Sequence, residues 1–270
     1  MPVSTSSSTA EDTGGNGSKG SVIELTAEPD HKVAFCENLA YPLLVNDGEI
    51  AAHEHFAIMR SRLVNARAKL GISSVMITSP EREEGKTMIC ANLAISFGRL
   101  GRPRLLVVDG DLRVRGLTGL LRMHDRPGLA EYLQRNISLQ EAVHPTTYPS
   151  VFVAPAGNCS DDLLPAILEG GRWPEFLAEA KQQFDLILID SVPAVAPIAD
   201  CELLGSACDT ILLIVRLGKT SREALDFAKK SMERKLLGVV INNTDRSLGL
   251  SYDSYYRKTK QSIVHNSSPK

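Results

Sequence analysis

The sequence has no long run of apolar residues. Nowhere in its 270 residues does an uninterrupted apolar stretch approach the roughly 18 to 20 residues that cross a bilayer. The first residues also lack the apolar core of a secretory signal peptide. We therefore expect a cytoplasmic protein without a transmembrane segment of its own.

Paired cysteines and a strong net charge are missing as well. The five cysteines are odd in number and have no close pair spacing: Cys36, Cys90, Cys159, Cys201 and Cys208. This excludes a disulfide framework or a zinc site and favours reduced thiols. The formal net charge of −2 gives no overall signature of nucleic-acid binding.

What is present is an ordinary globular composition with polar ends. Hydrophobic residues make up 43% and charged residues 23% of the chain, and its length suits one sizeable core. Residues 1–32 are rich in Ser, Thr and Gly, which predicts a disordered segment. We expect a folded domain over residues 50–245 and a flexible tail over residues 246–270.

Residues 72–88 have the layout of a phosphate-binding loop. A β-branched apolar run is followed by a polar loop, by Gly85-Lys86-Thr87, and then by a helical pattern. In such loops the backbone N–H groups and the helix N-terminus hold a polyphosphate, the lysine reaches its outer phosphates and the threonine binds Mg²⁺. Pro80 stands where the usual pattern has glycine, and three of the next four residues are acidic: Glu81, Glu83 and Glu84.

Apolar strands alternate with helical patterns along the rest of the chain. The expected strands cover residues 75–78, 104–109, 150–155, 184–190, 209–216 and 237–242. The expected helices cover residues 51–70, 85–100, 117–123, 128–134, 139–144, 173–183 and 221–236. Strands that are apolar throughout are typical of a parallel sheet covered on both faces, so we predict an α/β fold of the P-loop NTPase type.

Two of these strands end in carboxylates. Asp109, Asp111 and Arg113 follow one strand, and Asp190 ends another in the layout of a Walker B site. The carboxyl ends of parallel strands meet at the edge where such sheets bind ligands, and carboxylates there hold Mg²⁺. The same residues could also cap helices, but their number favours a site.

The helix over residues 51–70 has an apolar stripe and a basic remainder. The stripe consists of Phe56, Met59, Leu63, Ala66 and Leu70. Packing across the domain explains it; the basic face could instead meet a neighbouring subunit or an acidic partner.

Half of the six tyrosines lie close together in the polar tail: Tyr252, Tyr255 and Tyr256. Because their neighbours offer no apolar core, they are available as phosphoacceptors. Interleaved with basic residues, they could alternatively stack on single-stranded nucleic acid.

Together these motifs resemble the bacterial tyrosine kinases, the P-loop autokinases of capsule and exopolysaccharide export. The resemblance covers residues 50–260, and the Asp109-x-Asp111-x-Arg113 element is its most specific sign. It resembles the family's second Walker A-type motif. ATPases that position septa and plasmids are the nearest relatives of that family.

The resemblance implies a site for ATP and Mg²⁺. It implies nucleotide contacts from Ser79, Glu83, Glu84, Gly85, Lys86, Thr87, Met88 and Asn242, the last near the adenine. It implies Mg²⁺ binding by Thr87, Asp109, Asp111 and Asp190, and catalysis by Lys86, Asp109, Asp111 and Asp190. Asp109 would deprotonate a tyrosine from another subunit's tail.

The resemblance also implies partners. A transmembrane activator of the chain-length-regulator type would hold this cytoplasmic subunit at the inner face of the plasma membrane. Subunits would associate through the helix over residues 51–70, which carries Glu54 and Arg60 and has Ala57 at a position where arginine is usual. No nucleic acid is implied.

Alternatives follow from the loop. Glu83 occupies a position where the family has glycine, at a backbone cost of roughly 1 kcal/mol if φ is positive there. A catalytically weak P-loop protein that acts as a scaffold of the same export machinery is therefore the second hypothesis. A DNA-positioning ATPase is a distant third.

Overall fold

The computed structural model describes residues 50–194 and 199–243. The expected amino-terminal disordered segment and the tyrosine-bearing tail lie outside the described residues. None of the helices within the described ranges combines the length and hydropathy that crossing a bilayer requires.

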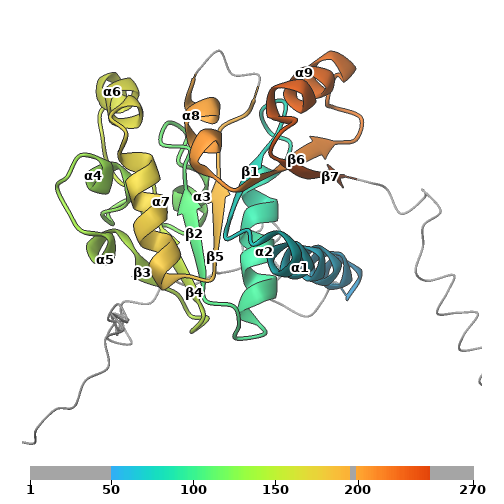
Figure 1. Ribbon diagram of the computed structural model, residues 1–270, viewed down its shortest axis with the longest axis horizontal. Coiled ribbons are helices and arrows are strands. Elements are labelled where there is room, and N and C mark those ends of the chain that lie inside the picture. The colour runs from blue at the N-terminus through green and yellow to red at the C-terminus, as the bar shows by residue number, and fades with distance from the viewer. Residues whose placement is uncertain (1–49, 195–198, 244–270) are drawn as a thin grey trace, which may run out of the picture.

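A seven-stranded sheet forms the centre of the structure, in the order β3-β4-β2-β5-β1-β6-β7 (Figure 1). All neighbouring strands are parallel except β3, which pairs antiparallel with β4. The strands are β1 Ser74–Thr78, β2 Leu105–Asp109, β3 His144–Pro145, β4 Val151–Ala154, β5 Leu186–Asp190, β6 Thr210–Arg216 and β7 Leu236–Asn242. The predicted α/β fold with a mostly parallel sheet is confirmed.

Helices connect the strands. They are α1 Ile50–Leu70, α2 Lys86–Gly98, α3 Gly116–Leu120, α4 Leu129–Leu133, α5 Leu139–Ala142, α6 Leu164–Glu169, α7 Arg172–Gln183, α8 Asp200–Ala207 and α9 Arg222–Met232. A short 3₁₀ turn, Asp161–Leu163, precedes α6. The predicted helix over residues 139–144 was too long, because the chain leaves the helix after Ala142 and His144 pairs with β4. Helices α6 and α8 were not predicted.

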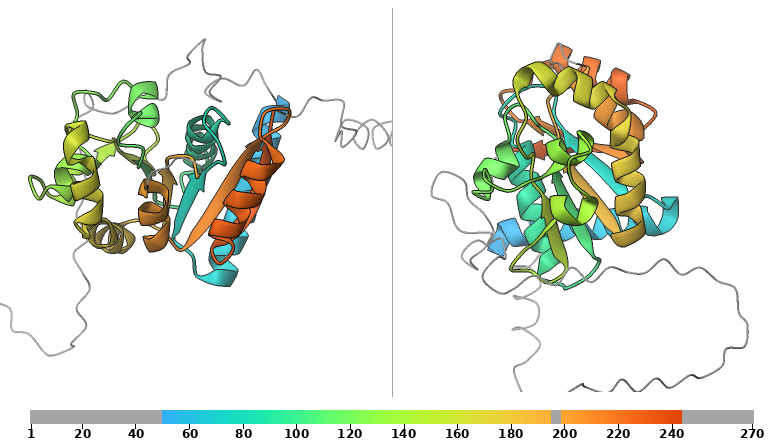
Figure 2. Two further views of the ribbon diagram at one scale, coloured as in Figure 1. Left: turned by 90° about the horizontal axis from the view of Figure 1, so that it is seen from above. Right: turned by 90° about the vertical axis from the view of Figure 1, so that its left-hand side faces the viewer.

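Side chains of successive strand residues enter two different cores. In β1, Met76 packs with the core formed by α4 to α9, whereas Val75 and Ile77 pack with the core formed by α1, α2 and α3. The same alternation holds in β2 and β5. These three strands are therefore buried on both faces, which explains their uninterrupted apolar runs. Figure 2 shows the sheet between these helical layers from two further directions.

Helix α1 packs along α2. Leu63 is buried, and Phe56, Met59 and Ala66 pack against the same core, but Leu70 is 66% exposed and does not belong to the buried stripe. Two of its arginines bind within the chain. Arg60 donates hydrogen bonds to the carbonyl and hydroxyl of Ser96, at 2.7 and 2.6 Å. Arg67 binds the carbonyl and carboxylate of Asp185.

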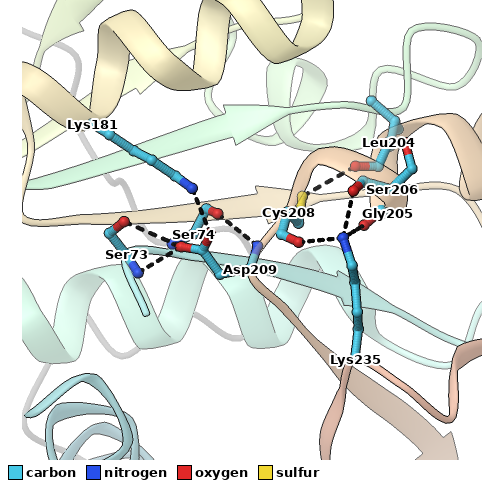
Figure 3. A network of polar contacts seen from close by, with 9 residues as sticks. All are labelled: Ser73, Ser74, Lys181, Leu204, Gly205, Ser206, Cys208, Asp209 and Lys235. Atoms are coloured by element: carbon cyan, nitrogen blue, oxygen red, sulfur yellow. Dashed lines mark hydrogen bonds and ion pairs between the residues drawn. The ribbon is translucent and has the colours of Figure 1, made fainter. Parts of the chain in front are cut away.

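A polar network ties the amino-terminal ends of β1 and β6 together (Figure 3). Asp209 accepts hydrogen bonds from the backbone N–H groups of Ser73 and Ser74 and from Lys181 Nζ on α7. Burial alone would raise the pKa of Asp209, but these hydrogen bonds outweigh burial and lower the pKa to about 2. The Nζ of Lys235 binds carbonyls at the end of α8, those of Gly205, Ser206 and Cys208.

Candidate active site

The loop between β1 and α2 needs glycine at position 85. Gly85 has φ 98°, in the left-handed region, and a Cβ built there would lie 2.3 Å from Asn242 Nδ2. No other residue fits this position without displacing Asn242. Helix α2 begins at the next residue, Lys86, so the helix N-terminus adjoins this loop, and the charge of Lys86 acts on Asp190. Strand, loop and helix follow one another as the sequence predicts.

Glu83 has φ 58° and therefore adopts the left-handed conformation that the family's glycine would favour. Two side chains hold it there: Arg216 Nη1 donates to its carbonyl at 3.1 Å, and Lys219 Nζ lies 2.9 Å from its carboxylate. The carboxylate of Glu83 thus binds a lysine of the β6–α9 loop. The bond to Lys219 also lowers the pKa of Glu83.

The other two acids of the loop are bound as well. One carboxylate oxygen of Glu84 accepts a hydrogen bond from the Thr220 hydroxyl and the other accepts the backbone N–H of Glu81. Glu81 in turn accepts the N–H of Ser221 at 3.3 Å. Each of the three carboxylates therefore has a partner in the β6–α9 loop.

Asp109 and Asp190 lie side by side at the carboxyl ends of β2 and β5, where they are register partners. Both are buried. Neither carboxylate oxygen of Asp190 has a hydrogen-bond partner among the described residues, and the Thr87 hydroxyl lies nearby outside hydrogen-bonding geometry. Burial first, and then the charge of Asp109, raise the pKa of Asp190 to about 8. This pocket disfavours two negative charges unless a cation is present.

Asp109 differs from Asp190 because its oxygens are engaged. One oxygen accepts the N–H and the hydroxyl of Thr118, both at 2.7 Å, and the other accepts the N–H of Asp111 at 3.2 Å. Burial raises the pKa of Asp109 to about 6, against the effect of the Thr118 hydrogen bonds. Asp109 is therefore more basic than an ordinary carboxylate. Asp111 accepts the N–H of Val114.

The residues that surround Asp190 fit a magnesium ion. Neither of its two oxygens has a hydrogen-bond partner among the described residues. The hydroxyl of Thr87 lies next to Gly116, and a Cβ at that glycine would come within 3.0 Å of it. Within residues 50–194 and 199–243, no three His, Cys, Asp or Glu side chains form a metal cluster. A site of few protein oxygens suits Mg²⁺, which keeps water and phosphate ligands.

The structure places the remaining predicted residues as follows. Ser79 is buried at the end of β1 and its hydroxyl binds the carbonyl of Glu81 at 2.5 Å. Met88 packs against the core beneath α1. Asn242 donates to the carbonyl of Glu84 at 2.9 Å, so its side chain contacts the loop itself. The three tail tyrosines lie outside the described residues.

Three features of the site have no signal in the sequence. Thr118 holds Asp109, Gly116 leaves room for Thr87, and Thr220 binds Glu84. Each is a common residue in an ordinary context, and only the fold brings it to the site. The salt bridge between Arg113 and the buried Asp200, at 2.8 Å, was equally unforeseen.

The comparisons with known proteins agree with this geometry. No family model matches the chain. The tyrosine-protein kinase YwqD of Bacillus subtilis (strain 168) is 31% identical over 209 residues, which cover 76% of this chain and 86% of YwqD. The succinoglycan biosynthesis transport protein ExoP of Rhizobium meliloti (strain 1021) is 30% identical over 176 residues, 63% of this chain and 22% of ExoP.

Two solved structures share the fold. The kinase domain of Escherichia coli tyrosine kinase ETK has a TM-score of 0.67 and 22% identity, covering 80% of this chain and 88% of that chain. The septum site-determining protein MinD from Pyrococcus horikoshii OT3, complexed with Mg-ADP, has a TM-score of 0.54 and 24% identity, covering 65% and 72%. Given the identity and coverage of YwqD, the chain belongs to the bacterial tyrosine kinase family.

Proposed function

We propose that this kinase is an autokinase, which transfers the terminal phosphoryl group of ATP to tyrosines of its own carboxyl-terminal tail. The proposed acceptors are Tyr252, Tyr255 and Tyr256. In this proposal the phosphorylation state of the tail regulates synthesis and export of a polysaccharide, a process related to the one for which ExoP is named.

The position of Asp109 and Asp190 supports this proposal most strongly. Two buried carboxylates lie in register at neighbouring strand ends, and the charge of Lys86 acts on Asp190. Because no described residue hydrogen-bonds to either oxygen of Asp190, the site is electrostatically incomplete without a cation. A nucleotide with its Mg²⁺ supplies the missing charge.

Each residue then has a role in phosphoryl transfer. The loop N–H groups and Lys86 bind the phosphates, and Thr87, Asp111 and Asp190 would hold Mg²⁺, which neutralises phosphate charge when bound. Asp109 orients the tyrosine hydroxyl and accepts its proton. The bond from the terminal phosphorus to ADP breaks, the bond to the tyrosine oxygen forms, and ADP leaves with the electron pair. Positioning and charge neutralisation suffice for this reaction.

The scaffold hypothesis depended on the acidic loop. The carboxylates of Glu81, Glu83 and Glu84 bind the β6–α9 loop, so each of them already has a partner within the chain. No observation now favours a degenerate site over an active one.

The proposal is tested with chain isolated from its native cells, where any activator is present. Phosphate is located by mass spectrometry before and after incubation with Mg·ATP. We expect phosphotyrosine at the three tail positions, and none in a Lys86→Met variant. Intact ATP binding without phosphotyrosine in the tail would refute the autokinase.

Two assemblies complete the proposal. The kinase associates with a transmembrane activator at the inner face of the plasma membrane, and copies associate with one another through α1. The outer face of α1 supports the second point, because Glu54, Ile58 and Arg62 are exposed at successive turns. Arg60 is unsuited to this contact, since it already binds Ser96.

A further inference from the structure

The β6–α9 loop, residues 217–221, lies against the phosphate-binding loop. Together with Arg216 at the end of β6, it contacts each acidic residue of that loop. The contacts run from Ser221 to Glu81, from Arg216 and Lys219 to Glu83, and from Thr220 to Glu84. Since Thr220 and Glu84 are 136 residues apart in the chain, this contact exists only in the folded protein.

These contacts differ greatly in weight. The side chain of Glu83 is 83% exposed, and surface ion pairs of this kind contribute little. The bond from Ser221 to Glu81 is long, at 3.3 Å. Glu84, in contrast, is fully buried, and a buried carboxylate depends on its hydrogen-bond partners. The pair Thr220 and Glu84 therefore dominates the contact between the two loops.

Thr220 is itself held in place. Its hydroxyl accepts the N–H of Arg216 at 2.9 Å and donates to Glu84. Glu84 is fixed at two more points, because its second oxygen accepts the N–H of Glu81 and its carbonyl accepts Asn242 Nδ2, both at 2.9 Å. The residue directly before Gly85-Lys86 is thus bound to the β6–α9 loop, to β7 and to its own loop.

We propose that Thr220 and Glu84 are positioning residues, which hold the phosphate-binding loop in its nucleotide-binding conformation before a nucleotide arrives. This inference rests on the proposed function, because it takes ATP as the ligand of the loop. A loop that is already ordered binds more tightly, since the nucleotide does not have to order it. Loss of the Thr220 hydroxyl should therefore weaken ATP binding more than it affects the chemical step.

The test compares Mg·ATP affinity, by isothermal titration calorimetry, in four forms of the full chain. Thr220→Val removes the hydroxyl at nearly constant volume, and Thr220→Ser restores it. Thr210→Val is the matched control. The Thr210 hydroxyl binds the Lys235 carbonyl at the start of β6, at the end of that strand far from the phosphate-binding loop. We expect Thr220→Val to raise Kd about tenfold, and Thr220→Ser and Thr210→Val to stay within about twofold of wild type.

Kinetics and melting temperatures separate positioning from general stability. Thr220→Val should raise KM for ATP and leave kcat at saturating ATP within about twofold. If the loss of any threonine hydroxyl weakened the fold and thereby ATP binding, Thr210→Val would show the same loss of affinity and the same fall in melting temperature. Glu84→Gln tests the other partner of this contact. Its single amide oxygen cannot replace both carboxylate oxygens as acceptors, so we expect it to weaken Mg·ATP binding as well.

The outcomes are distinct. If wild type binds Mg·ATP and both Thr220→Val and Glu84→Gln bind it equally well, the positioning role is overturned and the proposed function stands. Equal weakening in Thr220→Val and Thr210→Val likewise overturns it, in favour of a structural effect. If wild type itself does not bind Mg·ATP, the proposed function fails, and the positioning role fails with it.

Discussion

At the scale of single residues, Glu83 and Glu84 show how neighbours of identical chemistry differ in their surroundings. Glu83 is exposed and lies at φ 58°, whereas Glu84 is fully buried and satisfies both a hydroxyl and an N–H group. The loop therefore tolerates one acid and depends on the other.

Alanine variants should separate the two acids. Glu84→Ala leaves the Thr220 hydroxyl and the Glu81 N–H without their acceptor, and we expect it to lower the free energy of unfolding by about 1 to 3 kcal/mol. Glu83→Ala removes an exposed ion pair and should leave that free energy nearly unchanged. Urea denaturation measures both; a larger effect at Glu83 would contradict the assignment.

Asp190→Asn should raise the stability of the nucleotide-free protein and abolish its Mg²⁺-dependent binding of ATP. Neither oxygen of this buried carboxyl has a hydrogen-bond partner within residues 50–194 and 199–243, so its charge is unfavourable in the nucleotide-free chain. We expect the melting temperature of the nucleotide-free variant to rise by a few degrees, and its Mg²⁺-dependent ATP binding to be lost. Asp111→Asn is the comparison, since Asp111 accepts a backbone N–H and gains less. An unchanged or lower melting temperature in Asp190→Asn would show that burial does not penalise this carboxylate.

The sequence indicates most of the site's reactive groups but few of their partners. Gly85, Lys86 and Asp190 stand out because the loop and the strand end have recognisable patterns. Thr118 and Thr220 do not, because a hydroxyl that binds a distant carboxylate leaves no periodicity or spacing behind. The direction of the loop acids was equally hidden, since it depends on β6 packing beside β1.

At the scale of elements, the network around Asp209 fastens β1, β6 and α7 at the end of the sheet opposite the site. By accepting the N–H groups of Ser73 and Ser74, Asp209 joins two strands that are far apart in sequence. The three elements also share the core on which the site rests. The network acts on the fold and only indirectly on the chemistry.

Asp209→Asn tests this network through pH. The folded pKa of about 2 lies below the unfolded value of about 4, so the carboxylate stabilises the fold above pH 4 and this contribution is lost as pH falls toward 2. Because the group is partly exposed, we expect a stability difference from wild type of only about 1 kcal/mol at neutral pH. Urea denaturation between pH 2 and pH 7 should show it vanish in acid. A difference that is constant with pH would assign it to packing.

Strands were predictable where the sequence has an uninterrupted apolar run. The six longer strands each have such a run, although β7 is only partly buried in the structure. Strand β3 was missed because it has two residues, one of them a proline at the sheet edge, and gives no periodic signal. Helices α6 and α8, with six and eight residues, were missed although the buried Leu164, Ile167 and Leu168 of α6 follow helical spacing.

At the scale of the whole molecule, α1 presents a surface that no other described residue covers. We expect Ile58→Asp to shift the protein to monomers in size-exclusion chromatography with light scattering, because Ile58 is 40% exposed on the proposed contact face. Val64→Asp is the control: Val64 is 44% exposed but lies on another side of the helix. If wild type is monomeric throughout, or if both variants behave alike, association through this face is wrong.

The parallel pairing of the last two strands also places the end of β7 close to the phosphate-binding loop. Strand β7 runs parallel to β6, so Asn242 lies at the same edge as the phosphate-binding loop, which it contacts. Tyr252 follows ten residues later, and ten residues span at most about 35 Å. A tyrosine on such a short tether has an effective concentration in the millimolar range at a site within its reach. Under the proposed autokinase function, a free tail peptide would therefore need about millimolar concentrations to compete with the attached tail.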